Sequence, residues 1–237
     1  MFYFLTSSPL IGRTAQLNND NVFADELIYR LEGKNKALFI AADPENTSAN
    51  DSFSQAVTAA VNAAGGKLEE TVVLDTRNAS EAETLVGRAE MIILSGGHVP
   101  TQNEFFRSIG LKGLLGDFTG VILGISAGTM NSARIVYAEP ELEGEATDPD
   151  YMRFLPGLGI TMTRIIPHFT EDHSFLDGLD ILEDIILPDS IGHRFYALPD
   201  GSYIMGDGSM EMLCGDAWLI EDGIIRKISS DGEKRYI

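Results

Sequence analysis

The sequence predicts an α/β fold in which a mainly parallel sheet carries helices on both faces. Short apolar runs alternate with helical patterns through the first half of the 237 residues, and repeated strand-helix units of this kind imply parallel strands. A group of short strand patterns near the C-terminus adds extra strands to this architecture. The length suits one α/β domain, and neither a linker nor an internal repeat divides the chain. We therefore expect a single domain over residues 1–237.

The elements of the first half follow in order. Residues 1–8 begin with an apolar run and predict a first strand, and Lys36–Ala42 predicts a buried second one. Apolar residues at helical spacing from Phe53 to Ala64 predict a helix that stops at Gly65-Gly66. Two capping boxes open the next helices, which alternate with three strands. The capping boxes are Ser80-x-x-Glu83 and Thr101-x-x-Glu104, and the strands are Thr71–Leu74, Met91–Leu94 and Val121–Ile125.

The pattern changes after about Ala133. The acidic stretch Glu139–Asp150 has no helical or strand period, which predicts a surface loop. The later strand-like runs are Thr161–Pro167, Tyr203–Met205, Glu211–Leu213, Ala217–Glu221 and Ile224–Ile228. The last two flank Asp222-Gly223, which is typical of a hairpin turn. We expect these strands at the edge of the same domain.

The composition excludes several classes of partner. There are 17 Lys and Arg against 36 Asp and Glu, a net charge of -19, so nucleic acid and anionic membrane surfaces are repelled. No apolar stretch reaches the ~18 residues of a membrane-spanning helix. One cysteine, Cys214, allows neither an intrachain disulfide nor a thiolate metal cluster. We expect a cytoplasmic protein, with a homo-oligomer left open.

The most informative motif is Gly124-x-Ser126-x-Gly128. It follows the predicted strand Val121–Ile125 directly and precedes a predicted helix, Ala127–Arg134. This is the pattern of a nucleophile elbow, in which glycines let a strand turn sharply into a helix and expose a serine hydroxyl. The N–H of Ala127, at the helix N-terminus, would point at an oxyanion beside Ser126. A strand-to-helix turn without catalysis is the alternative.

A second glycine loop, Ser95-Gly96-Gly97-His98, leaves the strand Met91–Leu94. Parallel strands present their C-terminal ends at one edge of a sheet, so this loop is expected next to the elbow. The N–H of Gly97 would then be a second oxyanion donor. Alternatively, the glycines only make a tight turn.

A serine nucleophile needs a base, and the chain has four histidines. His168 is the best candidate because it ends the strand-like run Thr161–Pro167 and precedes polar residues. Glu171, Asp172 and His173 follow it, but no second cluster supports a metal site. The acidic run from Glu139 to Asp150 lacks the alternating ligands of a calcium loop and predicts a solvated face instead. No metal or cofactor is expected.

With Ser126, Gly97 and His168 assigned, the sequence resembles the serine peptidase family that contains aspartyl dipeptidase (dipeptidase E) and cyanophycinase. The pieces that match are Phe4-Leu-Thr-Ser, Ser95-Gly-Gly, Gly124-Ile-Ser-Ala-Gly128, Pro167-His-Phe169 and Leu198-Pro-Asp-Gly-Ser202. The resemblance implies a fold like that of class I glutamine amidotransferases, with serine in place of the cysteine nucleophile. Cys214 lies far from the elbow in sequence, which disfavours an amidotransferase.

Carried over, the resemblance implies that Ser126 is the nucleophile, His168 the general base, and the N–H groups of Gly97 and Ala127 the oxyanion hole. The third member of the triad is Asp200, where the family often has Glu, or an acid soon after the nucleophile, near Glu139 or Glu141. The family's Gly-Gly-Asn-Thr loop is altered here, because His98-Val99 replaces Asn-Thr. The role of His98 stays open, and the substrate preference can differ.

The leading hypothesis is a serine exopeptidase that hydrolyses short peptides, with an acidic first residue as the preference suggested by the resemblance. Such a preference needs cations near the cleft, for which Arg134, Arg164 and Arg194 are the candidates. An esterase is the second hypothesis, since the same elbow serves ester hydrolysis. The third is a catalytically silent protein that binds a peptide or metabolite in the inherited cleft.

Overall fold

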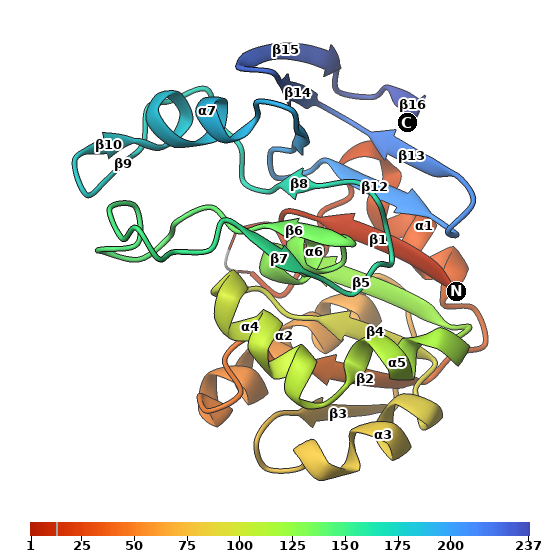
Figure 1. The fold of residues 1–237 in the computed structure, drawn as a ribbon. Coiled ribbons are helices and arrows are strands. Elements are labelled where there is room, and N and C mark those ends of the chain that lie inside the picture. The colour runs from red at the N-terminus through yellow and green to blue at the C-terminus, as the bar shows by residue number, and fades with distance from the viewer. Residues whose placement is uncertain (13) are drawn as a thin grey trace.

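An eight-stranded sheet forms the centre of the computed structural model, which describes residues 1–12 and 14–237 (Figure 1). Its strand order is β16-β13-β12-β1-β5-β4-β2-β3. The five mutually parallel strands are β1 (Phe2–Thr6), β5 (Val121–Ile125), β4 (Met91–Leu94), β2 (Lys36–Ile40) and β3 (Glu70–Leu74). The antiparallel strands are β12 (Tyr203–Gly206), β13 (Glu211–Cys214) and β16 (Lys234–Tyr236). The predicted α/β class, mainly parallel with extra C-terminal strands, is confirmed.

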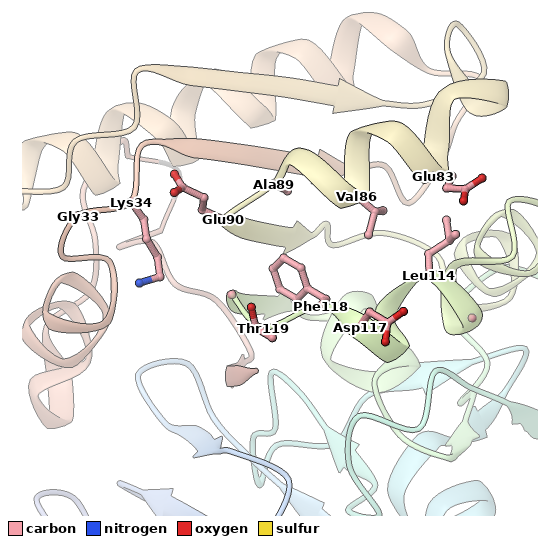
Figure 2. A pocket seen from close by; sticks show the side chains of 13 residues that line it. Gly33, Lys34, Glu83, Val86, Ala89, Glu90, Leu114, Asp117, Phe118 and Thr119 are labelled. Carbon is pink, nitrogen blue, oxygen red and sulfur yellow. The ribbon is translucent and has the colours of Figure 1, made fainter.

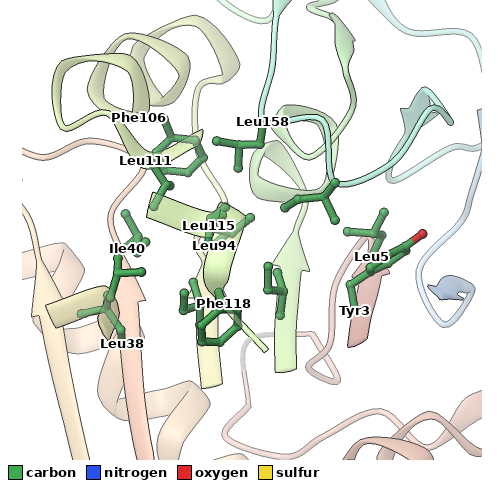
Figure 3. Close-up of a cluster of buried hydrophobic side chains, with 14 of the residues drawn as sticks. Tyr3, Leu5, Leu38, Ile40, Leu94, Phe106, Leu111, Leu115, Phe118 and Leu158 are labelled. Atoms are coloured by element: carbon green, nitrogen blue, oxygen red, sulfur yellow. The ribbon is translucent and has the colours of Figure 1, made fainter. Parts of the chain in front are cut away.

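Helices cover both faces of this sheet. One face packs on α1 (Phe23–Arg30) and α2 (Thr47–Ala63), the other on α3 (Ala82–Arg88), α4 (Val99–Ser108) and α5 (Leu111–Leu114). Neighbouring strand residues point to opposite faces. Phe4 is buried on the side of α1 and α2, and Leu5 is buried in the cluster on the side of α3, α4 and α5, which Figure 3 shows. Burial on both faces explains why these strands are continuous apolar runs in the sequence.

A smaller sheet, in the order β15-β14-β11-β8, carries the later part of the chain. Its strands are β8 (Ile165–Ile166), β11 (Arg194–Ala197), β14 (Ala217–Glu221) and β15 (Ile224–Ser229). Strand β8 is parallel to β11, and the other pairs are antiparallel. Asp222 and Gly223 both have positive φ, 51° and 75°, as the predicted two-residue hairpin turn requires.

The chain also contains further short elements. Two antiparallel pairs are β6 (Ile135–Tyr137) with β7 (Phe154–Pro156) and β9 (Phe175–Leu176) with β10 (Leu179–Asp180). The remaining helical segments are α6 (Ala127–Asn131), α7 (Leu187–Asp189), a π-helix (Ile181–Ile186) and 3-10 turns at Asp20–Val22, Ala79–Glu81 and Leu115–Asp117. Every helix in the described part of the chain is too short or too polar to cross a membrane.

Several local predictions were wrong. Neither capping box forms: α3 is preceded by a 3-10 turn that contains Ser80, and α4 begins at Val99 because Pro100, with its fixed φ, belongs to the first turn. Helix α6 ends at Asn131 instead of Arg134, since the residues after it pair with 157–161. The run Thr161–Pro167 contains only two strand residues.

Candidate active site

Ser126 lies at the sharp turn between β5 and α6. It is the N-cap residue of α6, with φ 49° and ψ -110°, a conformation that costs free energy for any residue with a side chain. Two hydrogen bonds to the carbonyl of Thr6 at the end of β1 hold the turn. The Ser126 N–H donates one at 3.0 Å and the Thr129 hydroxyl the other at 2.8 Å. The predicted elbow geometry is therefore present at Ser126.

The glycines of the motif are required by close packing. A Cβ atom on Gly128 would lie 2.2 Å from the carbonyl oxygen of Leu94, and one on Gly124 would lie 2.9 Å from the Thr129 hydroxyl. The Gly128 N–H donates to the carbonyl of Ser95 at 3.1 Å. Helix α6 thus begins in direct contact with the chain that leaves β4. Glycine is the residue that permits such an approach.

The loop after β4 lies beside the elbow, as expected from neighbouring parallel strands. A Cβ on Gly96 would be 3.4 Å from the Cβ of Ser126. Gly97 has φ 154°, and a Cβ there would be 2.6 Å from that of Ala42. Among the described residues, the N–H groups of Gly97 and Ala127 donate no hydrogen bond to carbonyls or side chains. Both groups remain available for an oxyanion.

His168 and Asp200 lie at the ends of neighbouring parallel strands of the smaller sheet. His168 follows β8 with φ 55°, and its Nδ1 lies 2.7 Å from Oδ1 of Asp200, in the turn after β11. The His168 side chain is 48% exposed and that of Asp200 58%. Of the acids proposed to orient the imidazole, Asp200 is the one in hydrogen-bond contact with it.

Hydrogen bonds from the segment that follows β1 hold the turn that carries Asp200. The Ser7 hydroxyl, just past β1, donates to the carbonyl of Leu198 at 2.8 Å, and the Asn21 amide donates to the carbonyl of Gly201 at 3.0 Å. The elbow and this turn are thus both attached to the C-terminal end of β1. Their relative position depends on that shared anchor.

A cavity of about 200 Å³ joins the elbow to His168. Its lining residues are Ser126, Glu139, Glu141, Ile166, Pro167, His168, Phe169, Thr170, Asp172, Ser174, Ile181, Leu182 and Ile186. In the described part of the chain no hydrogen bond joins Ser126 to His168, a contact that is often loose before substrate binds. Arg134, Arg164 and Arg194 do not line the cavity, and Arg194 pairs with Glu221 at 2.6 Å.

Two carboxyl groups in this cavity have raised pKa values. Burial, with a smaller contribution from Glu141, raises the pKa of Glu139 to about 8. Burial and the nearby Glu145 raise the pKa of Glu141 to about 7, and His168 opposes this shift. Both values lie far above the ordinary range of a glutamate. The predicted solvated face is only partly right at Glu139, which is half-buried in the cavity lining just after β6, the strand that pairs with β7.

The rest of the acidic loop is held by contacts that the sequence pattern did not indicate. The carboxylate of Glu145 accepts the N–H groups of Glu141 and Leu142 and lies 2.8 Å from Nε2 of His98. Asp177 accepts the N–H groups of Gly144 and Ala146. His98 therefore ties the acidic loop to the glycine loop. Only the His98-Val99 departure from the family motif drew attention to this position.

The other two histidines lie outside the cavity lining. His173 pairs with Asp180 at 2.5 Å, and His193 packs against Phe154 with ring centroids 4.4 Å apart. Within residues 1–12 and 14–237, no three histidine, cysteine or acidic side chains gather as metal ligands. The structure therefore assigns neither histidine to the chemistry at Ser126.

A larger cavity of about 700 Å³ lies at the opposite end of the parallel strands (Figure 2). Lys34, Glu90 and Gly120, which line it, immediately precede or lie close to the starts of β2, β4 and β5. The Glu90 carboxylate accepts the N–H groups of Asn35 and Lys36, a structural role. No serine, cysteine or histidine is among its described lining residues, so the chemistry belongs at the elbow.

Comparison with known proteins shows the family of the chain and relatives of its fold. The model of peptidase family S51 matches residues 5–213, whereas no curated protein matches the chain. The crystal structure of a peptidase from an acI-B1 Actinobacterium is similar, with a TM-score of 0.69, 19% identity, and coverage of 100% of this chain and 96% of that one. A putative peptidase E protein from Listeria monocytogenes EGD-e has a TM-score of 0.60, 17% identity, and coverage of 96% and 98%. These two structures share the fold.

Replacing Gly128 with alanine should destabilise the protein. The added methyl would overlap the backbone of Leu94, so we expect the free energy of unfolding to fall by roughly 1–3 kcal/mol or more. Gly87, exposed within α3 with nothing near its missing Cβ, is the matched control. Gly87→Ala should be neutral or stabilising by about 0.4–1 kcal/mol in the same denaturant titration. Equal effects of the two changes would contradict the packing argument.

Glu139→Gln should stabilise the protein increasingly as the pH rises. The folded carboxyl has a pKa of about 8, whereas an unfolded glutamate titrates near ~4.3, so the folded state holds an extra proton between these values and loses stability with rising pH. Glutamine removes this loss. The thermal midpoint of the variant relative to wild type should therefore grow from pH 5 to pH 9. Exposed Glu143→Gln is the control, and a constant difference for Glu139→Gln would refute the prediction.

Proposed function

Because the chain belongs to peptidase family S51 and is a serine peptidase, we propose that it is an exopeptidase or dipeptidase that hydrolyses short peptides through an acyl-enzyme at Ser126. One observation carries the proposal: Ser126 and His168 line one cavity, and Asp200 contacts Nδ1 of His168. We further propose that the chain acts as a single cytoplasmic domain over residues 1–237.

In this mechanism His168 is the general base. Its Nδ1–H donates to Asp200, which leaves Nε2 free to accept the proton of the serine hydroxyl. Nε2 takes the hydroxyl proton as Ser126 Oγ attacks the peptide carbonyl, and then gives it to the leaving amine. Water then attacks the resulting ester while Nε2 takes a proton from it, and Nε2 returns that proton to Ser126 Oγ as the acyl group leaves. Asp200 stabilises the imidazolium that exists between these steps.

The oxyanion of the tetrahedral intermediate would lie between the two loops at the sheet edge. The N–H of Ala127 opens α6, and the N–H of Gly97 comes from the loop beside the elbow. Backbone donors already in place cost no reorganisation when the negative charge develops. The absence of other acceptors for these two N–H groups among the described residues supports this role.

The size of the cavity favours small substrates. About 200 Å³ is below the roughly 300–1,000 Å³ of common ligand pockets, which suits one residue of a short peptide. A preference for an acidic first residue stays a prediction. The described residues that line the cavity include no lysine or arginine that would support it. A dipeptide panel that varies the first residue tests it. Aspartyl dipeptides that are cleaved no faster than alanyl or leucyl ones would remove the preference and keep the peptidase.

Ser126→Ala should abolish hydrolysis while the fold and the thermal midpoint stay nearly unchanged. Loss of a serine nucleophile lowers kcat by on the order of 10⁶-fold. A fluorophosphonate label, followed by mass spectrometry, should modify Ser126 in the wild type and nothing in the variant. The label separates the two enzymes, peptidase and esterase, from a silent binding protein. Wild-type peptidase activity in Ser126→Ala would reject the mechanism.

Asp200→Asn should lower kcat by roughly 10³- to 10⁴-fold with little effect on folding, because asparagine keeps the shape but cannot stabilise the imidazolium. The comparison is kcat at saturating substrate for Asp200→Asn, Glu139→Gln and Glu141→Gln. A large fall in kcat for a glutamate variant, with Asp200→Asn near wild type, would transfer the orienting role to the acidic loop.

A further inference from the structure

Both ring nitrogens of His98 are engaged, and the proposed mechanism uses neither of them. Nδ1 lies 2.8 Å from the hydroxyl of Thr101, and Nε2 lies 2.8 Å from Oε1 of Glu145. A carboxylate only accepts hydrogen bonds, so Nε2 carries a proton and donates it. The Thr101 hydroxyl can donate to Nδ1 or accept from it. The ring is therefore held at two points in either of its protonation states.

His98 belongs to a firmly held part of the fold. It is the N-cap residue of α4, and its carbonyl accepts the N–H of Gln102 at 3.1 Å. The amides of Gln102 and Asn103 are buried, and both bond with the amide of Asn131 at the end of α6. These buried bonds fix α4 relative to the elbow at Ser126. The imidazole thus projects from a helix whose position beside the nucleophile is set.

The partner of the ring, Glu145, organises the acidic loop. Its Oε2 accepts the N–H groups of Glu141 and Leu142, both at 2.9 Å, and Glu141 lines the cavity beside Ser126. The side chains of His98 and Glu145 are only 22% and 17% exposed, so water competes less for their bond than at an open surface pair. One carboxylate therefore joins the imidazole to the backbone of the cavity wall.

The other hydrogen bonds of the loop lead away from the elbow. Asp177, in the turn between β9 and β10, accepts the N–H groups of Gly144 and Ala146. The Tyr151 hydroxyl donates to the carbonyl of Glu139 from within the same stretch of chain. In the described part of the chain, the bond between His98 and Glu145 is the one hydrogen bond that links this loop to α4, to α6 or to the glycine loop.

We propose that His98 is a positioning residue that holds the acidic loop in place as a wall of the substrate cavity. The inference rests on the proposed function, because it takes this cavity as the place where the peptide binds. His98 is not among the described residues that line the cavity. It acts through Glu145 on the backbone of Glu141.

The consequence falls on substrate binding. Without the bond to Glu145 the loop leaves its place for part of the time, and the apparent affinity for the peptide falls by the fraction of time that the wall is in place. Bound peptide restores the wall, so the chemical step at Ser126 proceeds as before. A raised KM with an unchanged kcat is the result expected of such a residue.

Two amide variants separate the two bonds of the ring. The side-chain amide of glutamine reaches nearly as far as Nε2 of histidine, and that of asparagine nearly as far as Nδ1. His98→Gln thus keeps a donor for Glu145 and loses the contact with Thr101, whereas His98→Asn does the reverse. On the best substrate of the dipeptide panel, His98→Asn should raise KM about tenfold at unchanged kcat, as the loss of a hydrogen bond to a charged group does. His98→Gln should restore KM to near the wild-type value.

Hydrogen exchange in the free protein measures the position of the loop without any substrate. The N–H groups of Glu141 and Leu142 should exchange about tenfold faster in His98→Asn than in the wild type, and at the wild-type rate in His98→Gln. The N–H groups of β4 are the internal control and should exchange alike in all three proteins. Glu143→Gln, from the exposed part of the same loop, should match the wild type in both measurements.

Equal KM values for His98→Asn and His98→Gln, a fall in kcat at unchanged KM, or equal exchange of the loop in the two variants would overturn the positioning role. Unchanged thermal midpoints establish that both variants fold. A wild-type protein that hydrolyses no peptide would refute the proposed function and the effect on KM with it. Hydrogen exchange then decides separately whether His98 holds the loop.

Discussion

The close packing of Gly128 against the carbonyl of Leu94 is the constraint on which the candidate site depends. It sets α6 directly over the end of β4, so the chain has one residue, Ser126, in which to turn from strand to helix. That residue takes a left-handed backbone conformation, and the bonds to Thr6 sustain it. The same contact brings the glycine loop beside Ser126, so one packing contact positions both the nucleophile and the oxyanion donors.

The base comes from a different sheet. His168 and Asp200 are adjacent because β8 runs parallel to β11, and the Ser7 hydroxyl connects their end of the smaller sheet to β1. Both side chains are about half exposed, so water competes for the hydrogen bond between them in the free protein. A peptide that covers His168 would exclude this water. The orientation of the base therefore depends on how the two sheets dock.

The charge of the whole chain and the charge of the cavity have the same sign. A net charge of -19 attracts cations over long distances, where salt screens it. Glu139, which is half-buried, and Glu141, which is exposed, lie in the lining of the cavity beside Ser126 and His168. The loop that carries them is held by His98 and Asp177. These hydrogen bonds fix the backbone of the loop that forms this part of the cavity wall.

The sequence by itself determined the α/β class, the strands β4 and β5 to the residue, and Ser126 at the turn, because apolar runs and glycine spacing are local properties of the chain. It also singled out His168 and left Asp200 to compete with Glu139 and Glu141. The tertiary structure decided that Asp200 contacts the imidazole and that Glu139 is half-buried in the lining of the cavity. It also decided where α6 ends. Those outcomes depend on pairing between segments that are distant in the sequence, such as β8 with β11, and the carboxylates that compete for one role are chemically alike until the fold gives each a different environment.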